Sequence, residues 1–257
     1  MQAIKSRLKK NPIVRKVYSF FFRSKNNFST QHWVSNYIPN ESITVVQIGA
    51  NDGISGDPLY QLAKENKAWN ILFVEPVPSI FELLKNNYPK EDRFKFENAG
   101  INADGENQFF YTVSETAYTA IPDLSELYRQ IGSFDKNHIT KLSEGKLTNY
   151  IQANEVNCLT LEQLFSKNDI HSLDLLFIDA EGYDWKIISQ LDLDKFKPRI
   201  IYLEYCNLEQ EEYDACVSFL SSKYYVFALR INFLCIRRDI IKEKDLKILK
   251  AKLQSPK

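Results

Sequence analysis

Residues 43–53 read ITVVQIGANDG, and this stretch decides the fold. An almost continuous apolar and β-branched run that stops at a glycine is typical of a parallel strand buried on both faces. The strand is followed by a turn rich in Gly, Asn and Asp. In open α/β sheets ligands bind beyond the carboxyl ends of such strands. The stretch therefore predicts a core strand that delivers a ligand-binding loop.

Strand and helix patterns alternate along the chain from residue 41 onward. Further strands are predicted at 70–75, 93–97, 173–179, 198–204, 224–229 and 233–237, and a β-ribbon at 108–113. Helices are predicted at 58–65, 78–88, 159–168, 185–191 and 209–221. The alternation predicts an α/β fold with a doubly wound sheet. The last two strands are joined by residues 230–232 alone, and so short a connection joins only antiparallel strands. We expect a seven-stranded, mostly parallel sheet with an antiparallel last strand.

Composition excludes several classes of protein. The chain has 257 residues, of which 44% are hydrophobic and 26% charged, as in ordinary globular proteins. It has no apolar run of the ~18 residues that a transmembrane helix needs. The four cysteines are scattered without C-x-x-C spacing, which argues against a zinc ribbon or a disulfide scaffold. They fit a reducing compartment, so we expect a cytoplasmic protein.

Charge is unevenly distributed although the net charge is zero. Residues 1–40 contain eight Lys or Arg and no Asp or Glu, so the remainder is acidic and a nucleic-acid partner is not expected. Residues 1–28 combine short apolar runs with flanking basic residues. Such a segment forms either a peripheral contact with the inner face of a membrane or a helix packed on the domain.

The chain is expected to divide into three parts. Residues 1–40 form the basic, helical N-terminal segment, residues 41–240 the main α/β domain, and residues 241–257 a Lys-rich tail. Within the domain, residues at about 114–153 are irregular and rich in Ser, Asn, Gly and Thr. Long insertions of this kind in compact domains tend to be lids or binding loops, so we expect this one to contact the molecule on which the protein acts.

The loop after the first strand and the end of the second point to an adenosine ligand. The loop contains Gly49, Ala50, Asn51, Asp52 and Gly53 but neither G-x-G-x-x-G nor a P-loop motif. The Asp52 carboxylate would repel a pyrophosphate and suits a cationic amine or sulfonium. Glu75 ends the second strand, where a carboxylate accepts hydrogen bonds from both ribose hydroxyls. Glu75 alone does not distinguish NAD from S-adenosylmethionine.

A cluster of carboxylates follows the strand at 173–179. Residues 179–184 read DAEGYD, and Glu204 ends the neighbouring strand. Asp179, Glu181 and Glu204 are candidate ligands of Mg²⁺ or Ca²⁺, since these ions prefer oxygen. Alternatively, Asp179 or Glu181 is the general base for a substrate hydroxyl, with His138 of the insertion as a weaker candidate. Asp184 also has a structural explanation as a helix cap.

These motifs together resemble the FkbM family of S-adenosylmethionine-dependent methyltransferases. The resemblance rests on VVQIGANDG at 45–53, FVEP at 73–76 and LFIDAEGYD at 176–184, in this order and spacing, and covers roughly residues 41–237. It implies a Rossmann-like methyltransferase fold and O-methyl transfer, commonly to hydroxyls of glycans or natural products.

The resemblance also implies roles for individual residues. Gly49, Asn51 and Gly53 would line the methionine part of the cofactor, Glu75 would hold the ribose, and Asn98 and Ala99 would lie beside adenine. Asp179 and Glu181 would face the reacting methyl group. The family often has Asp where this chain has Gln47, and a neutral amide cannot pair with the cofactor's ammonium group. Asp52 and Asp179 then become the candidates for that pairing.

The hypothesis from sequence is an S-adenosylmethionine-dependent O-methyltransferase that acts on a sugar, a glycan or a related small molecule. Glu181 or Asp179 would remove the hydroxyl proton, and aromatic residues such as Tyr111, Tyr118 and Phe134 would stack on a sugar ring. Two alternatives stay open. One is an NAD-dependent oxidoreductase or epimerase, against which the missing G-x-G-x-x-G weighs. The other is a catalytically silent methyltransferase-like module that binds a partner or a membrane.

Overall fold

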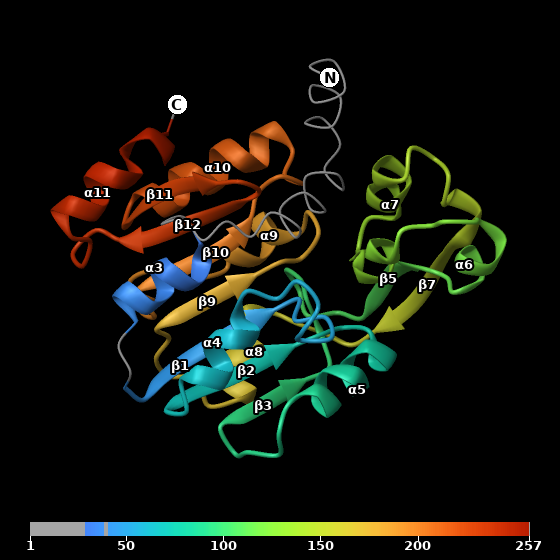
Figure 1. Ribbon diagram of the computed structural model, residues 1–257, viewed down its shortest axis with the longest axis horizontal. Coiled ribbons are helices and arrows are strands. Elements are labelled where there is room, and N and C mark those ends of the chain that lie inside the picture. Colours follow the sequence, from blue (N-terminus) through green and yellow to red (C-terminus); the bar gives the residue numbers. More distant parts are fainter. Residues whose placement is uncertain (1–28, 39–40, 257) are drawn as a thin grey trace.

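The computed structural model describes residues 29–38 and 41–256, and its centre is a single eight-stranded sheet (Figure 1). The strands lie in the order β13-β11-β12-β10-β9-β1-β2-β3. Their bounds are β1 Ile43–Ile48, β2 Trp69–Val74, β3 Phe94–Glu97, β9 Leu175–Ile178, β10 Ile200–Glu204, β11 Tyr224–Leu229, β12 Asn232–Arg237 and β13 Leu253–Gln254. β1, β2, β3, β9 and β10 pair in parallel. β12 is antiparallel to both β10 and β11. The doubly wound, mostly parallel sheet with antiparallel end strands is therefore confirmed.

Helices cover both faces of the sheet because the central strands bury side chains on both sides. On one face, residues such as Val45 and Phe73 pack against α3 (Thr30–Tyr37), α4 (Leu59–Glu65), α5 (Pro78–Asn87) and α11 (Glu243–Leu249). On the other, residues such as Val46 and Leu72 pack against α8 (Leu161–Lys167), α9 (Asp184–Ile188) and α10 (Gln210–Ser221). Alternation of neighbouring side chains between the faces is the period-two pattern of a strand.

Residues 241–257 hold more structure than the predicted Lys-rich tail. They contain α11 and then β13, which pairs with β11 and adds an eighth strand to the seven predicted. The Tyr37 hydroxyl in α3 donates to Asp245 Oδ2 at 2.6 Å. Periodicity could not indicate β13, because a two-residue strand is too short to show it.

The N-terminal segment is described only in part. α3 lies within residues 1–40, and its Trp33 and Val34 are fully buried against the sheet. Residues 1–28, on which the membrane-contact hypothesis depends, lie outside the described residues. Within the described ranges, every helix is too short or too polar to span a bilayer.

Residues 108–156 form a separate structural unit, here called the insertion lobe, which stands beside the sheet in Figure 1. It consists of a three-stranded antiparallel sheet with the helices α6 (Thr116–Ala120) and α7 (Lys136–Leu142). Its strands are β5 (Gln108–Val113), β6 (Gly132–Ser133) and β7 (Ile151–Val156). The lobe has its own hydrophobic cluster, which includes Ala117, Ile139 and Leu147. The predicted insertion at about 114–153 lies inside this unit, and the strands that flank it pair with each other. The two-residue strands β4 (Gly100–Ile101) and β8 (Cys158–Leu159), which precede and follow the lobe in the chain, pair in parallel.

Candidate active site

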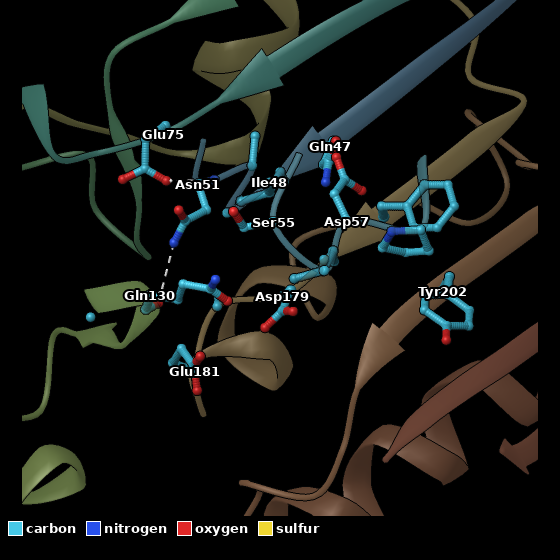
Figure 2. A pocket seen from close by; sticks show the side chains of 18 of the residues that line it. Gln47, Ile48, Asn51, Ser55, Asp57, Glu75, Gln130, Asp179, Glu181 and Tyr202 are labelled. Carbon is cyan, nitrogen blue, oxygen red and sulfur yellow. Dashed lines mark hydrogen bonds between the residues drawn. The ribbon is translucent and has the colours of Figure 1, made fainter. Parts of the chain in front are cut away.

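A cleft of about 910 Å³ lies at the carboxyl ends of β1, β2, β9 and β10. The turn between β11 and β12, the start of α3, the segment around Asp57 and part of the insertion lobe also line it. Figure 2 shows Gln47, Asp57, Glu75, Asp179 and Glu181 around this space. Ligand pockets are commonly ~300–1,000 Å³, so the cleft has room for a large ligand or for two smaller ones.

Gly49 allows the loop after β1 to pass directly against the end of β9. Its φ is +77°, and a Cβ atom there would lie 2.0 Å from the Asp179 carbonyl oxygen. The neighbouring strands are in register, with Ile48 opposite Ile178. Only glycine fits this position, because any side chain would collide with backbone. The close approach places Asp179 next to the β1 loop in the lining of the cleft.

Asn51 connects the loop to two other parts of the cleft. Its backbone has a φ of +50°, a left-handed conformation that Asn tolerates better than most residues. Its backbone N–H donates to Glu75 Oε2 at 2.9 Å, and its side-chain Nδ2 donates to the Gln130 carbonyl oxygen of the insertion lobe at 3.3 Å. Asn51 therefore joins the end of β2 to the lobe (Figure 2).

Asp52 and Gly53 shape this loop but lie outside the lining of the cleft. Asp52 Oδ1 accepts from the backbone N–H groups of Ile54 and Ser55, and Oδ2 accepts from the Ser55 hydroxyl at 2.6 Å. A Cβ atom on Gly53 would collide with side chains of Leu84 and Tyr88. The expectation that Asp52 pairs with a ligand cation is not favoured, because its carboxylate closes the turn.

Glu75 presents a buried carboxylate to the cleft. It is 5% exposed, and its Oε1 accepts from the Val77 backbone N–H at 3.0 Å. Burial raises the pKa of Glu75 to about 7, although the N–H groups of Val77 and Asn51 oppose the rise. Each carboxylate oxygen still has a lone pair for a ligand hydroxyl.

Of the two residues predicted beside adenine, only Ala99 lines the cleft. Asn98 instead donates from Nδ2 to the carbonyl oxygens of Glu75 and Pro76, at 2.8 and 3.1 Å. Asn98 thus fixes the backbone that follows β2 and acts on the site through Glu75.

Asp179, Glu181 and Glu204 come together as the sequence predicts. One carboxylate oxygen from each lies within 4.8 Å of the others. Asp179 and Glu181 line the cleft, whereas Glu204 is buried behind them. Asn207 Nδ2 donates to Glu204 Oε2 at 2.6 Å and to Glu181 Oε2 at 3.2 Å. Sequence reasoning missed Asn207, whose only signal was its place just after the strand that ends at Glu204.

Asp184 holds the loop that carries Glu181. It is fully buried, and its carboxylate accepts from the backbone N–H groups of Ala180 at 3.4 Å and Gly182 at 3.2 Å. Burial and the neighbouring Asp179 raise its pKa to about 8. Glu181 itself has a φ of +49°, so its backbone is strained and must be held by such contacts.

His138, in α7 of the insertion lobe, lies next to Glu181 on the side away from the cleft. Its Nε2 lies 3.7 Å from Glu181 Oε2, and the imidazole does not line the cleft. The Ser133 hydroxyl of the same lobe donates to the Glu181 carbonyl oxygen at 3.3 Å. The lobe thus contacts the side chain and the backbone of one cleft residue.

The aromatic residues of the lobe divide into two groups. Phe134 lines the cleft together with Phe110, and the two rings pack edge to face with centroids 5.0 Å apart. Tyr111 and Tyr118, which the sequence suggested as stacking residues, pack instead against the lobe's own hydrophobic cluster. Tyr202 of β10 and Asp57 also line the cleft, and sequence reasoning identified neither.

Comparisons with solved structures give distant similarities. Human methyltransferase-like protein 13, in a complex with SAH, is 12% identical with a TM-score of 0.42, over 96% of this chain and 93% of that one. Precorrin-6y C5,15-methyltransferase from Geobacter metallireducens is 14% identical with a TM-score of 0.39, over 80% and 78%. A fibrillarin pre-rRNA processing protein from Methanococcus jannaschii is 10% identical with a TM-score of 0.42, over 82% and 76%.

No curated protein sequence matches the chain significantly. The model of the FkbM methyltransferase domain, however, matches residues 47–227, which include the β1 loop, Glu75, the insertion lobe and the carboxylates. This match confirms the resemblance that the motifs indicated and favours methyl transfer over nicotinamide chemistry. The chain belongs to the FkbM family of methyltransferases.

Proposed function

We propose that the protein is an S-adenosylmethionine-dependent O-methyltransferase that acts on a hydroxyl of a sugar, a glycan or a related small molecule. The observation that carries the proposal is that Glu75 and the pair Asp179 and Glu181 face one cleft of about 910 Å³. Glu75 suits a ribose, and the other two carboxylates suit a reacting hydroxyl. The volume allows a cofactor and an acceptor to bind together.

The cofactor half of the cleft extends from Glu75 to the β1 loop. When bound, S-adenosylmethionine supplies a methyl group activated by its sulfonium. Glu75 would accept hydrogen bonds from the two ribose hydroxyls, and Val77 and Ala99 would pack on the adenine. Gly49 and Asn51 would present the backbone of their loop to the methionine part, as close approach of backbone to ligand requires.

The acceptor half lies between Glu181 and the insertion lobe. Glu181 would accept the proton of the acceptor hydroxyl as the oxygen forms its bond to the methyl carbon and the carbon–sulfur bond breaks. The products are a methyl ether and S-adenosylhomocysteine. Asn207 and His138 would hold the Glu181 carboxylate in place, because both contact its Oε2. Phe110 and Phe134 offer apolar surface for a sugar ring.

A divalent cation is the alternative use of the carboxylate trio. All three side chains offer oxygen, as Mg²⁺ prefers. The Asn207 amide, however, already donates to Glu181 and Glu204 between their carboxylates. We therefore assign the trio to proton transfer without a metal, and we expect methyl transfer to survive EDTA.

Calorimetric titration tests the proposal first. The purified protein should bind S-adenosylmethionine and S-adenosylhomocysteine and should not bind NAD, with and without Mg²⁺. Transfer of a labelled methyl group to sugars, nucleotide sugars and oligosaccharides then identifies the acceptor. Binding of NAD alone would overturn the proposal, and binding of none of these ligands would favour a catalytically silent module.

We also propose that the protein works in the cytoplasm, where its thiols remain reduced. Cys158, Cys216 and Cys235 are buried as free thiols, and Cys206 is partly buried. The basic residues 1–28 would bring the enzyme to anionic lipid at the inner membrane face. Sedimentation with phosphatidylserine vesicles, with and without residues 1–28, tests this part. Equal sedimentation of the two proteins would contradict it.

A further inference from the structure

We propose that Asp57 binds the α-ammonium group of S-adenosylmethionine. Gln47, where the family often has Asp, is neutral and cannot pair with that group. The inference rests on the proposed function, because it assigns one residue to one group of that cofactor. It replaces both Asp52 and Asp179 as the partner of the ammonium.

Asp57 is a buried residue of the cleft lining. It directly precedes Pro58 and α4, lines the cleft and is 8% exposed. Figure 2 shows Asp57 beside Gln47 at the end of β1, while Glu75 lies on the other side of the β1 loop. The ribose and the amino-acid end of the cofactor would then occupy opposite sides of that loop.

One oxygen of Asp57 is used by the fold and the other is open. Oδ1 accepts from the Leu59 backbone N–H at 2.7 Å, at the start of α4. Oδ2 is buried and makes no hydrogen bond within the part of the chain that the structure describes, although the Gln47 amide lies close enough to lower the pKa of the carboxyl. A buried carboxylate oxygen without a partner is costly, and a cation of the ligand would remove that cost.

The charged groups that raise the pKa of Asp57 are both carboxylates, and they favour a cation beside it. Burial raises the pKa of Asp57 to about 7, and the carboxylates of Asp179 and Asp52 add to the rise, while the Leu59 N–H and the Gln47 amide lower it. The Asp57 carboxylate in turn contributes to the raised pKa of the Tyr88 phenol. An ammonium beside Oδ2 would stabilise the ionised carboxylate and bring the pKa down again.

Gln47 completes the arrangement. It is 5% exposed in the middle of the sheet, with Phe73 and Phe177 opposite it on the neighbouring strands. An acidic residue at this position would place a second carboxylate against Asp57, and two buried like charges disfavour each other. The neutral amide instead leaves Asp57 as the one carboxylate of the pair.

The test compares two ligands that differ only in the ammonium group. Calorimetry measures the affinity of the wild-type protein for S-adenosylhomocysteine and for its deamino analogue. We expect the analogue to bind about 10- to 100-fold more weakly, as a hydrogen bond to a charged group is worth ~1.5–3 kcal/mol. Asp57→Asn retains an acceptor oxygen for the Leu59 N–H, and we expect it to bind both ligands with the same reduced affinity.

Matched variants separate Asp57 from its neighbours. Asp52→Asn and Asp179→Asn should keep the preference for the ammonium, and Glu75→Gln should weaken both ligands equally. If Asp179→Asn alone abolishes the preference, the ammonium lies at Asp179 and the inference is wrong. An equal affinity of the wild type for the two ligands would also overturn it, even if Asp57→Asn did not fold.

Proton release gives a second readout. With the Asp57 pKa at about 7 in the free protein, binding of the ammonium should release protons at pH 6–7, and affinity should rise with pH up to that range. Titrations in buffers of different ionisation enthalpy measure this release. Glu75 has a similar pKa, so the share assigned to Asp57 is the share that persists in Glu75→Gln. Failure of the wild type to bind either sulfur compound would overturn the proposed function together with this inference.

Discussion

Substitution of Gly49 by alanine tests whether the contact between the β1 loop and β9 determines the architecture of the site. An alanine at a φ of +77° is in the left-handed region, which costs ~1–2 kcal/mol. Its Cβ atom would also lie 2.0 Å from the Asp179 carbonyl oxygen, so backbone must move. Overpacking of this kind costs ~1–3 kcal/mol. We expect the free energy of unfolding to fall by about 2–5 kcal/mol in total.

Gly145→Ala is the matched control for this substitution. Gly145 has a φ of +82°, and nothing lies within 4 Å of the Cβ atom that alanine would add. Its loss should therefore be the conformational ~1–2 kcal/mol alone. Urea unfolding of the three proteins under the same conditions measures both losses. Equal losses for the two variants would refute the argument that Gly49 is required by its contact with Asp179.

Three further predictions concern catalysis, pH and the C-terminal elements. Glu181→Gln should lower kcat by about 10²- to 10⁴-fold with unchanged affinity for S-adenosylhomocysteine, as expected for a general base. His138→Asn should cause a smaller loss in kcat. Full activity of Glu181→Gln would exclude the role assigned to Glu181. Asp184 has a pKa raised to about 8 by burial, so the native state holds its proton more tightly than the unfolded chain and stability falls as pH rises from about 4 to 8. Asp184→Asn should flatten this part of the stability–pH curve, measured by urea unfolding at several pH values, and an unchanged slope would contradict the assignment. Tyr37→Phe should cost ~1–3 kcal/mol because it removes the 2.6 Å hydrogen bond to the buried Asp245, and a wild-type melting temperature would show that this contact is not needed.

The fold could be predicted from sequence because its signals are local. The run 43–48 followed by Gly49 is buried on both faces in the structure, and the short turn at 230–232 required antiparallel pairing. β13 escaped prediction because its two residues are a strand only by pairing with β11. Local pattern thus predicted elements that bury their own residues and missed β13, whose structure depends on a distant partner.

The candidate site was predictable where its residues are neighbours in sequence or end predicted strands. Glu75, Asp179 and Glu181 line the cleft for that reason. Residue type alone was misleading at Asp52, whose carboxylate serves the turn. Asp57 was missed because it lies beyond the motif and looks like an ordinary residue before a helix. Burial and an unpartnered oxygen, which distinguish it, are properties of the folded chain.

The insertion lobe links the two halves of the cleft in a way that sequence patterns do not show. Gln130 accepts a hydrogen bond from Asn51 in the loop assigned to the cofactor, and Ser133 donates to the carbonyl oxygen of Glu181, the assigned base. Both Asn51 and Glu181 have a positive φ and are therefore held in strained conformations. Residues 130–133 of the lobe thus support two strained residues, one in the half of the cleft assigned to the cofactor and one in the half assigned to the acceptor. A change in the lobe that accommodates a different acceptor would therefore act on cofactor binding as well as on acceptor choice, because the same backbone positions both.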